Sequence, residues 1–108
     1  MRKWRHTYCE TYRQNFYFIK CEPQQYVRLV KRTFDVDIDA PTGGGRFQVF
    51  YLDSIPIATI WIKEWHHLPH EVFHAVYWAL SYRGLWLSDG SEEAYAYMIE
   101  YLDGRFRQ

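Results

Sequence analysis

The sequence predicts an α+β fold, and three observations lead to that class. A short run of aromatic and β-branched residues is followed at once by a stretch with helical spacing. Two more strand-like runs come next, and two amphipathic stretches close the chain. Because strands and helices mix without a regular strand–helix–strand alternation, the order β-α-β-β-α-α indicates α+β.

The first strand and the first helix are adjacent in the sequence. NFYFIKC (15–21) is short, aromatic and β-branched, which is typical of a strand. EPQQYVRLVKRTF (22–34) has Pro23 where a first helical turn tolerates proline. Its apolar residues recur at helical spacing: Tyr26, Val27, Val30 and Phe34. DVDIDAPTGGGR (35–46) alternates and then breaks at Pro41 and three glycines, so an additional short strand leading into a flexible loop remains open.

Two further strands and a helix are predicted in the middle of the chain. RFQVFYL (46–52) and PIATIWIKEW (56–65) have strand composition and are joined at DSIP. A helix is then expected from Leu68 to about Arg83, with Gly84 as its stop.

The last helix is predicted in SEEAYAYMIEYLDGRF (91–106). Asp89 followed by Glu92 resembles a capping box, and Ser91 is the other candidate for the cap. We expect a small, mostly antiparallel sheet that packs on this helix and on the one before it.

Composition limits the classes of function. The chain has 108 residues, so we expect one domain spanning 1–108. Lysine plus arginine equals aspartate plus glutamate, which gives no electrostatic case for nucleic acid or an anionic membrane. The locally basic ends (Arg2, Lys3, Arg5; Arg105, Arg107) are interpreted as solvated termini.

The compartment is predicted from what the sequence lacks. No apolar run approaches the length of a membrane span, and the N-terminus lacks the apolar core of a secretory signal. Cys9 and Cys21 are too few for a disulfide scaffold and are interpreted as reduced thiols. The sequence therefore predicts a cytoplasmic protein with no membrane segment.

The motif that carries chemistry is His70-Glu71-Val72-Phe73-His74. Residues four apart share a helix face, so His70 and His74 can direct two imidazoles at one zinc ion. Zinc lowers the pKa of a bound water, and Glu71 lies close enough to accept its proton as general base and pass it to a leaving amine. The alternative is an exposed helix face with two solvated histidines.

The same helix has an apolar face on the side away from the histidines. We expect its core residues to be Val72, Phe73, Val76, Ala79 and Leu80. A separate core face favours a role for the histidines other than packing.

A catalytic zinc site needs a third protein ligand, and Glu93 is the candidate. The last helix is expected to bury Ala94, Tyr97, Met98 and Tyr101. Glu93 lies at the border of that stripe next to Tyr97, whereas Glu92 lies further round, on the solvent side. The alternative for Glu93 is a first-turn acid that complements the helix dipole.

LPHEVFHAV (68–76) followed by EEAYAY (92–97) resembles the small gluzincin metallopeptidases, over roughly residues 46–102. The resemblance is to compact phage and prophage proteins and, more distantly, to the ImmA/IrrE-like peptidases. It implies a zincin-like domain in which His70, His74 and Glu93 bind one zinc ion and Glu71 is the base. ATIWIK (58–63) is similar to the zincin edge strand that pairs with an extended substrate.

One element of the gluzincin pattern has no single match, namely the residue that stabilises the oxyanion. The candidates are Tyr97, Tyr101, His66 and His67, although a loop pair such as His66 and His67 is most often solvated. GGG (43–45) is not a phosphate loop, because no lysine followed by serine or threonine comes after it. It is interpreted as a flexible connection.

Three functions follow from these observations. The first is a zinc-dependent metallopeptidase acting on a protein or peptide. The second is a non-catalytic, zinc-stabilised interaction or assembly protein of phage type. The third is an α+β adaptor without metal.

Overall fold

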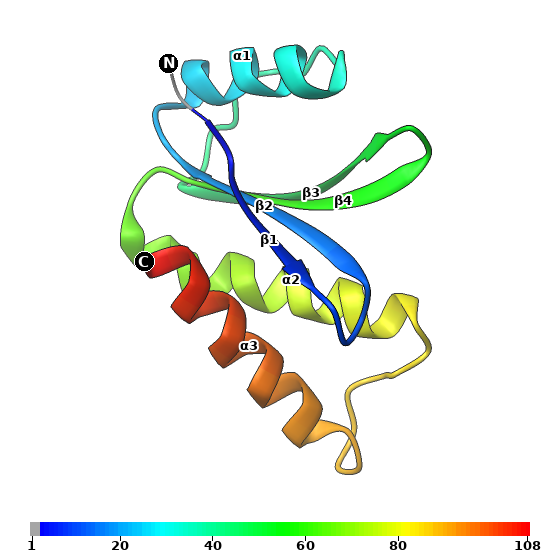
Figure 1. Ribbon diagram of the computed structural model, residues 1–108. Helices are drawn as coiled ribbons and strands as arrows, with labels where there is room; N and C mark the ends of the chain where they lie inside the picture. The colour runs from blue at the N-terminus through cyan, green and yellow to red at the C-terminus, as the bar shows by residue number, and fades with distance from the viewer. Residues whose placement is uncertain (1–2) are drawn as a thin grey trace.

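The computed structural model of the protein describes residues 3–108, and its helices cover both faces of one sheet (Figure 1). Helix α1 lies on one face, and α2 and α3 lie on the other. A short 3-10 turn, Trp65–His67, leads directly into α2. The elements in chain order are β1 (Arg5–Cys9), β2 (Gln14–Lys20), α1 (Pro23–Phe34), β3 (Gly45–Leu52), β4 (Ile55–Ile62), α2 (Leu68–Tyr82) and α3 (Glu92–Arg107).

The sheet is mixed, and its strand order is β1-β2-β4-β3. β1 and β2 form an antiparallel hairpin, as do β3 and β4, whereas β2 and β4 pair in parallel. The α+β class is confirmed. The sequence missed β1, which has five residues and buries only Thr7 and Cys9.

Strand β4 is a central strand, so the prediction that ATIWIK is the sheet edge is wrong. Ala58 pairs with Phe16 of β2 on one side and with Val49 of β3 on the other. The physical reason is burial on both faces, since every residue from Ile57 to Ile62 is buried. In the hairpin formed by β3 and β4, the strand at the edge of the sheet is β3.

The additional strand left open in residues 35–46 is absent over 35–44, which form an irregular connection. Asp35 adopts a left-handed conformation (φ 57°) and ends α1 by donating its N–H to the Lys31 carbonyl. The acidic residues and Val36 point to solvent, and only Ile38 packs against the core cluster under α1, so this stretch offers too little apolar surface for a strand.

Two apolar clusters hold the layers together, one on each face of the sheet. Alternate residues of β4 separate them. Ala58, Ile60 and Ile62 face α2 and α3, while Ile57 and Trp61 face α1.

The predicted core face of α2 is largely confirmed. Val72, Val76, Ala79 and Leu80 are fully buried. Phe73 is an exception because 41% of it is exposed, and its ring lies beside Tyr77 on the outer side of the helix.

The predicted core face of α3 is wrong except at Met98. Tyr97 is 68% exposed and Tyr101 is also exposed. The residues that α3 buries are Tyr95, Met98, Leu102 and Phe106. Phe106 accounts for this rotation, because its ring stacks on Phe18 of β2 with centroids 4.8 Å apart and fixes the C-terminal end of the helix.

Both helix boundaries near residues 84–92 have local causes. Gly84 ends α2 as predicted, in a left-handed conformation (φ 81°) that glycine adopts without strain. Ser91 is the N-cap residue of α3, so the alternative with Asp89 as the cap is wrong. The Ser91 hydroxyl does not cap the helix but accepts the Ser88 N–H and donates to the Trp86 carbonyl.

Over residues 3–108, none of the helices combines the length and the apolar character that crossing a membrane requires.

Candidate functional site

His70 and His74 direct their imidazoles at one point on the outer face of α2. Their Nε2 atoms are 3.1 Å apart, and the ring planes are nearly perpendicular (77°). Two Nε2 atoms that bind one tetrahedral zinc ion, each at about 2.0–2.1 Å, are roughly 3.3 Å apart. The two rings are thus within hydrogen-bond distance of each other, and this spacing is also close to that of two ligands of one zinc ion.

Glu71 lies beside this pair in a different environment, because only 6% of it is exposed. Burial raises the pKa of the Glu71 carboxyl above its usual range, and the fields of His70, His74 and His67 oppose that rise. A raised pKa brings a carboxylate closer to the working pH of a general base.

The Glu71 carboxylate does not form an ion pair with any imidazole in the described part of the chain. It is therefore near the histidine pair without being bound to it.

The glycines that precede β3 pack against this site. A Cβ placed on Gly45 would lie 2.9 Å from Cγ of Glu71 and 3.0 Å from its Oε2. A Cβ placed on Gly44 would lie 1.9 Å from Nε2 of His67. The interpretation of GGG as only a flexible connection missed this role, since the side chains that touch the glycines are distant in sequence.

The four candidates for the oxyanion donor lie in different places. Tyr97 and Tyr101 line a separate cavity between α3 and β1. His66 is exposed and its ring packs on His67, with centroids 4.0 Å apart. His67 is half-buried and close enough to Glu71 to influence its pKa, so it is the candidate that the fold places beside the base.

Glu93 is exposed in the first turn of α3. At about 100° per residue, it lies on the side of the helix opposite Met98 and Leu102, which face the core. Within residues 3–108, the structure forms no group of three histidine, cysteine or carboxylate side chains placed to hold a metal ion. The fold thus brings together His70, Glu71 and His74 but does not add Glu93 to them.

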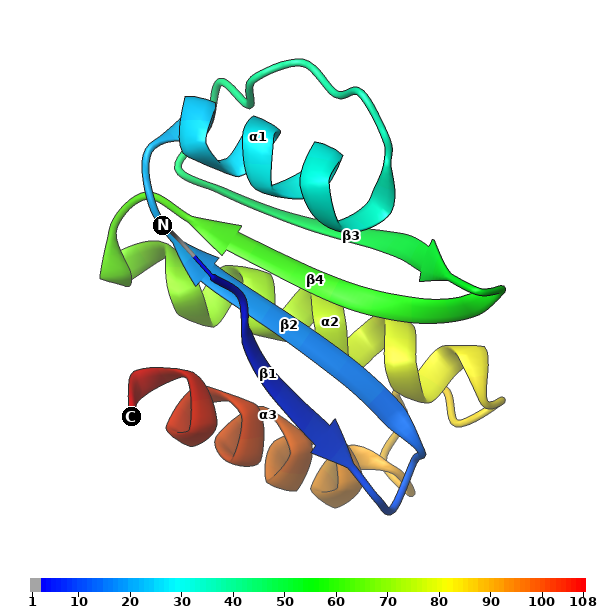
Figure 2. The ribbon, with the colours of Figure 1, turned by 45° about the horizontal axis from the view of Figure 1, so that its top comes forward.

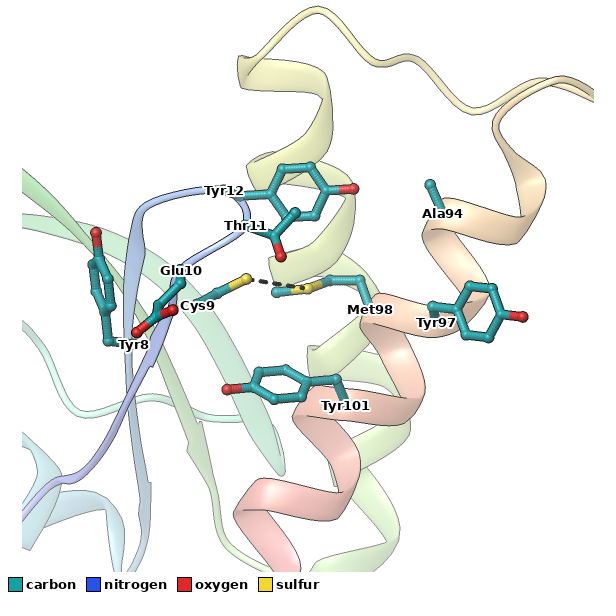
Figure 3. Close-up of a pocket in the computed structure, with 9 residues that line it drawn as sticks. All are labelled: Tyr8, Cys9, Glu10, Thr11, Tyr12, Ala94, Tyr97, Met98 and Tyr101. Atoms are coloured by element: carbon teal, nitrogen blue, oxygen red, sulfur yellow. Dashed lines mark hydrogen bonds between the residues drawn. The ribbon is translucent and has the colours of Figure 1, made fainter.

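A cavity of about 560 Å³ lies away from the histidines, between the β1–β2 hairpin and α3. Figure 3 shows the Cys9 thiol facing the Met98 thioether across it; the sulfur atoms are 3.9 Å apart. Four tyrosines are among the residues that line the cavity: Tyr8, Tyr12, Tyr97 and Tyr101. Apart from the oxyanion candidates Tyr97 and Tyr101 it contains none of the predicted site residues, and it has no histidine, so we do not assign the predicted zinc chemistry to it.

Comparison with models of protein families, with curated proteins and with solved structures gave no match to this chain. The likeness to gluzincins therefore remains a prediction that rests on the motif.

Proposed function

We propose that the protein is a zinc-dependent peptidase of the gluzincin type on a minimal zincin-like domain. The observation that carries the proposal is the convergence of the His70 and His74 Nε2 atoms, 3.1 Å apart, beside the buried Glu71. Two imidazoles and a carboxyl group of raised pKa are the groups that such a reaction uses.

In the proposed reaction, water attacks the carbonyl carbon of a peptide bond and the bond from carbon to nitrogen breaks. Zinc held by His70 and His74 would supply a Lewis acid that makes the water more acidic. Glu71 takes one proton from the water and delivers it to the leaving amine. His67 is the proposed donor of a hydrogen bond to the oxygen on which negative charge develops.

The edge strand β3 is the proposed binding strand for the peptide, in place of β4. Its free edge can pair with an extended substrate through main-chain hydrogen bonds. Gly45, the first residue of β3, already lies against Glu71, so a peptide bound at that end would reach the catalytic carboxylate.

The cytoplasm is the proposed compartment. Cys9 and Cys21 are buried in different core clusters, on opposite faces of the sheet, and are not joined by a disulfide. Such a pattern suits a reducing environment. The relation to phage-type proteins rests on the motif alone.

Exchange of the base separates catalysis from metal binding. Glu71→Gln is expected to lower peptide hydrolysis about a thousandfold or more, the scale of a general base, while the protein retains one zinc per chain. Elemental analysis and cleavage of a peptide library measure the two properties. Glu64→Gln, an exposed acid just before the motif, is the control and should behave as the unmodified protein. Equal hydrolysis by the Glu71→Gln variant would contradict the proposal.

The second candidate is the non-catalytic, zinc-stabilised interaction or assembly protein. The exposed position of Glu93 favours it, because two histidines without a third protein ligand suit a weak metal site better than a catalytic centre. This function predicts that zinc raises the melting temperature and that Glu71→Gln changes no measurable activity. Cleavage of a peptide that stops on addition of a chelator would exclude it.

A further inference from the structure

A second cavity, of about 460 Å³, lies at the end of the sheet where the parallel strands β2 and β4 finish. Figure 2 shows the start of β1 beside the arrowheads of these two strands, on the side of the molecule where α3 ends. The carboxyl ends of parallel strands are where open α/β sheets commonly bind ligands. The volume is within the range of small-molecule sites, about 300–1,000 Å³.

The walls of this cavity are basic. Three of the four lysines of the chain line it, together with Arg5: Lys3, Lys20 and Lys63. Two side-chain carboxylates, Glu22 and Glu64, accompany these four cations, so the side chains alone leave an excess of positive charge. Because the whole chain has no net charge, this excess is a local concentration of positive charge.

The positive charges are not neutralised by neighbouring acids. Among residues 3–108, the ion pairs involve Lys31 and Arg107, and none involves the three lysines of the cavity. Arg5 donates from Nη1 to the carbonyls of Arg105 and Phe106, at 3.4 and 3.3 Å, which holds the guanidinium at the rim.

An exposed aromatic ring forms one side of the cavity. Trp65 is 42% exposed, and it stacks on Phe18, with centroids 5.8 Å apart. Phe18 in turn stacks on Phe106. The Lys20 Nζ lies 6.0 Å from the Trp65 ring centroid, so the aromatic surface and a cation of the cavity are within reach of one small ligand.

We propose that this cavity binds a small phosphomonoester with an aromatic body, a ligand of the mononucleotide class. A phosphomonoester carries about −1.5 to −2 charges at neutral pH, so a lining with an excess of cationic side chains attracts it. Lysine binds phosphate as a point charge, and an aromatic base can stack against Trp65. The cavity is larger than one phosphate needs, and Trp65 and Phe18 line the additional space.

The test is a titration of zinc-free protein in the presence of a chelator, so that phosphate has no metal to bind at the histidines. Adenosine monophosphate is expected to bind once per chain, pyrophosphate more weakly, and adenosine not detectably. Lys20→Gln and Lys63→Gln should each weaken binding of adenosine monophosphate roughly fivefold, as expected for loss of one charge near the surface. Lys31→Gln is the matched control, because the fourth lysine pairs with Asp35 and Asp37 on α1.

Stacking of the base on Trp65 is tested by Trp65→Leu, which should weaken the binding of adenosine monophosphate more than the binding of pyrophosphate. Thermal unfolding of each variant and amide chemical shifts in NMR spectra show that the fold is kept. Binding that is unaffected by both lysine changes, or equal binding of adenosine, overturns the proposal. The proposal is also overturned if neither adenosine monophosphate nor pyrophosphate binds. It is overturned as well if the protein binds a single-stranded oligonucleotide or anionic vesicles but not these two small ligands. Because these measurements use zinc-free protein, their outcome is independent of whether the proposed peptidase activity exists.

Discussion

His70, Glu71 and His74 occupy different environments although they are neighbours on one helix. The two imidazoles are exposed and meet at Nε2, whereas the carboxyl is buried against the start of β3. Spacing on a helix explains this division, since the residue after the first histidine turns towards the sheet while i and i+4 stay on the outer face. The residues that are proposed to hold the metal and the residue that is proposed to move the proton are thereby kept apart.

Zinc affinity should depend on both members of the histidine pair. His70→Ala or His74→Ala is expected to lower the affinity by more than about a hundredfold, because loss of an indirect partner alone costs about 10–100-fold. Competition with a chromophoric chelator measures this. His66→Ala, on the exposed histidine just before α2, is the control and should change affinity less than about threefold. Similar affinities for all three variants would remove the pair as the metal site.

The role of Glu93 as third ligand can be separated from the general effect of an acid at the start of α3. Glu92 and Glu93 are both exposed and both lie in the first turn, so their effects on the helix dipole are alike. A ligand role predicts that Glu93→Gln weakens zinc binding at least about tenfold and that Glu92→Gln leaves it unchanged. The same chelator competition applies. Equal affinities would show that two histidines hold the metal without Glu93.

At the scale of elements, the site depends on the contact between α2 and the N-terminal end of β3. Gly45→Ala should displace the Glu71 side chain, since the new Cβ would lie 2.9 Å from its Cγ. Peptide hydrolysis is expected to fall by about tenfold or more, while zinc affinity stays within about threefold. Gly43→Ala is the matched control, because no atom lies within 4 Å of the new Cβ. Parallel loss of zinc and activity in Gly45→Ala would indicate general disruption of α2.

The sequence predicted α2 better than α3, and the difference is physical. In α2, the buried residues are small or branched and form one stripe, with Val72, Val76 and Ala79 at its centre. In α3, tyrosines occur on several sides, at 95, 97 and 101, so apolar spacing alone does not identify the inner face. The stacking of Phe106 on Phe18, which selects that face, joins residues far apart in the sequence.

Contacts between distant segments also explain what else the sequence missed. The glycines at 43–45 have no side chain to show a pattern, and only the fold reveals that Gly44 and Gly45 pack against His67 and Glu71. Lys3 and Arg5 of the basic N-terminus are exposed, as predicted, but only the fold reveals that they line one cavity with Lys20 and Lys63. Arg2, part of the same basic run, lies outside the described residues.

At the scale of the molecule, the sheet separates two cores with different tasks. The cluster below α2 and α3 positions the proposed site, and the cluster below α1 holds the first helix to β3 and β4. Tyr26 is at the centre of the second cluster, where its hydroxyl donates to Gln48 Oε1 at 2.8 Å and its ring stacks on Trp61.

Stability at alkaline pH should report on that second cluster. Burial raises the pKa of Tyr26 from 10.0 to about 12, with Arg46 opposing the rise. The folded state therefore keeps the proton where the unfolded state loses it, and stability falls as the pH rises above 10 towards 12. At about pH 11 this costs roughly 1 kcal/mol.

Tyr26→Phe should remove this part of the alkaline loss, although it costs about 1 kcal/mol at neutral pH by leaving Gln48 without its donor. Urea unfolding of the variant between about pH 8 and pH 11 measures the free energy of unfolding. Tyr82→Phe, on an exposed tyrosine of α2, is the control and should follow the unmodified protein. The same pH slope for Tyr26→Phe and the unmodified protein would contradict the assignment.

The central claim is that His70 and His74 share one zinc ion, and anomalous diffraction at the zinc absorption edge tests it most directly. Crystals of the protein grown with one equivalent of zinc are predicted to show a single anomalous peak within about 2.0–2.1 Å of both Nε2 atoms. A peak elsewhere in the molecule, or no peak beside this pair, would contradict the account.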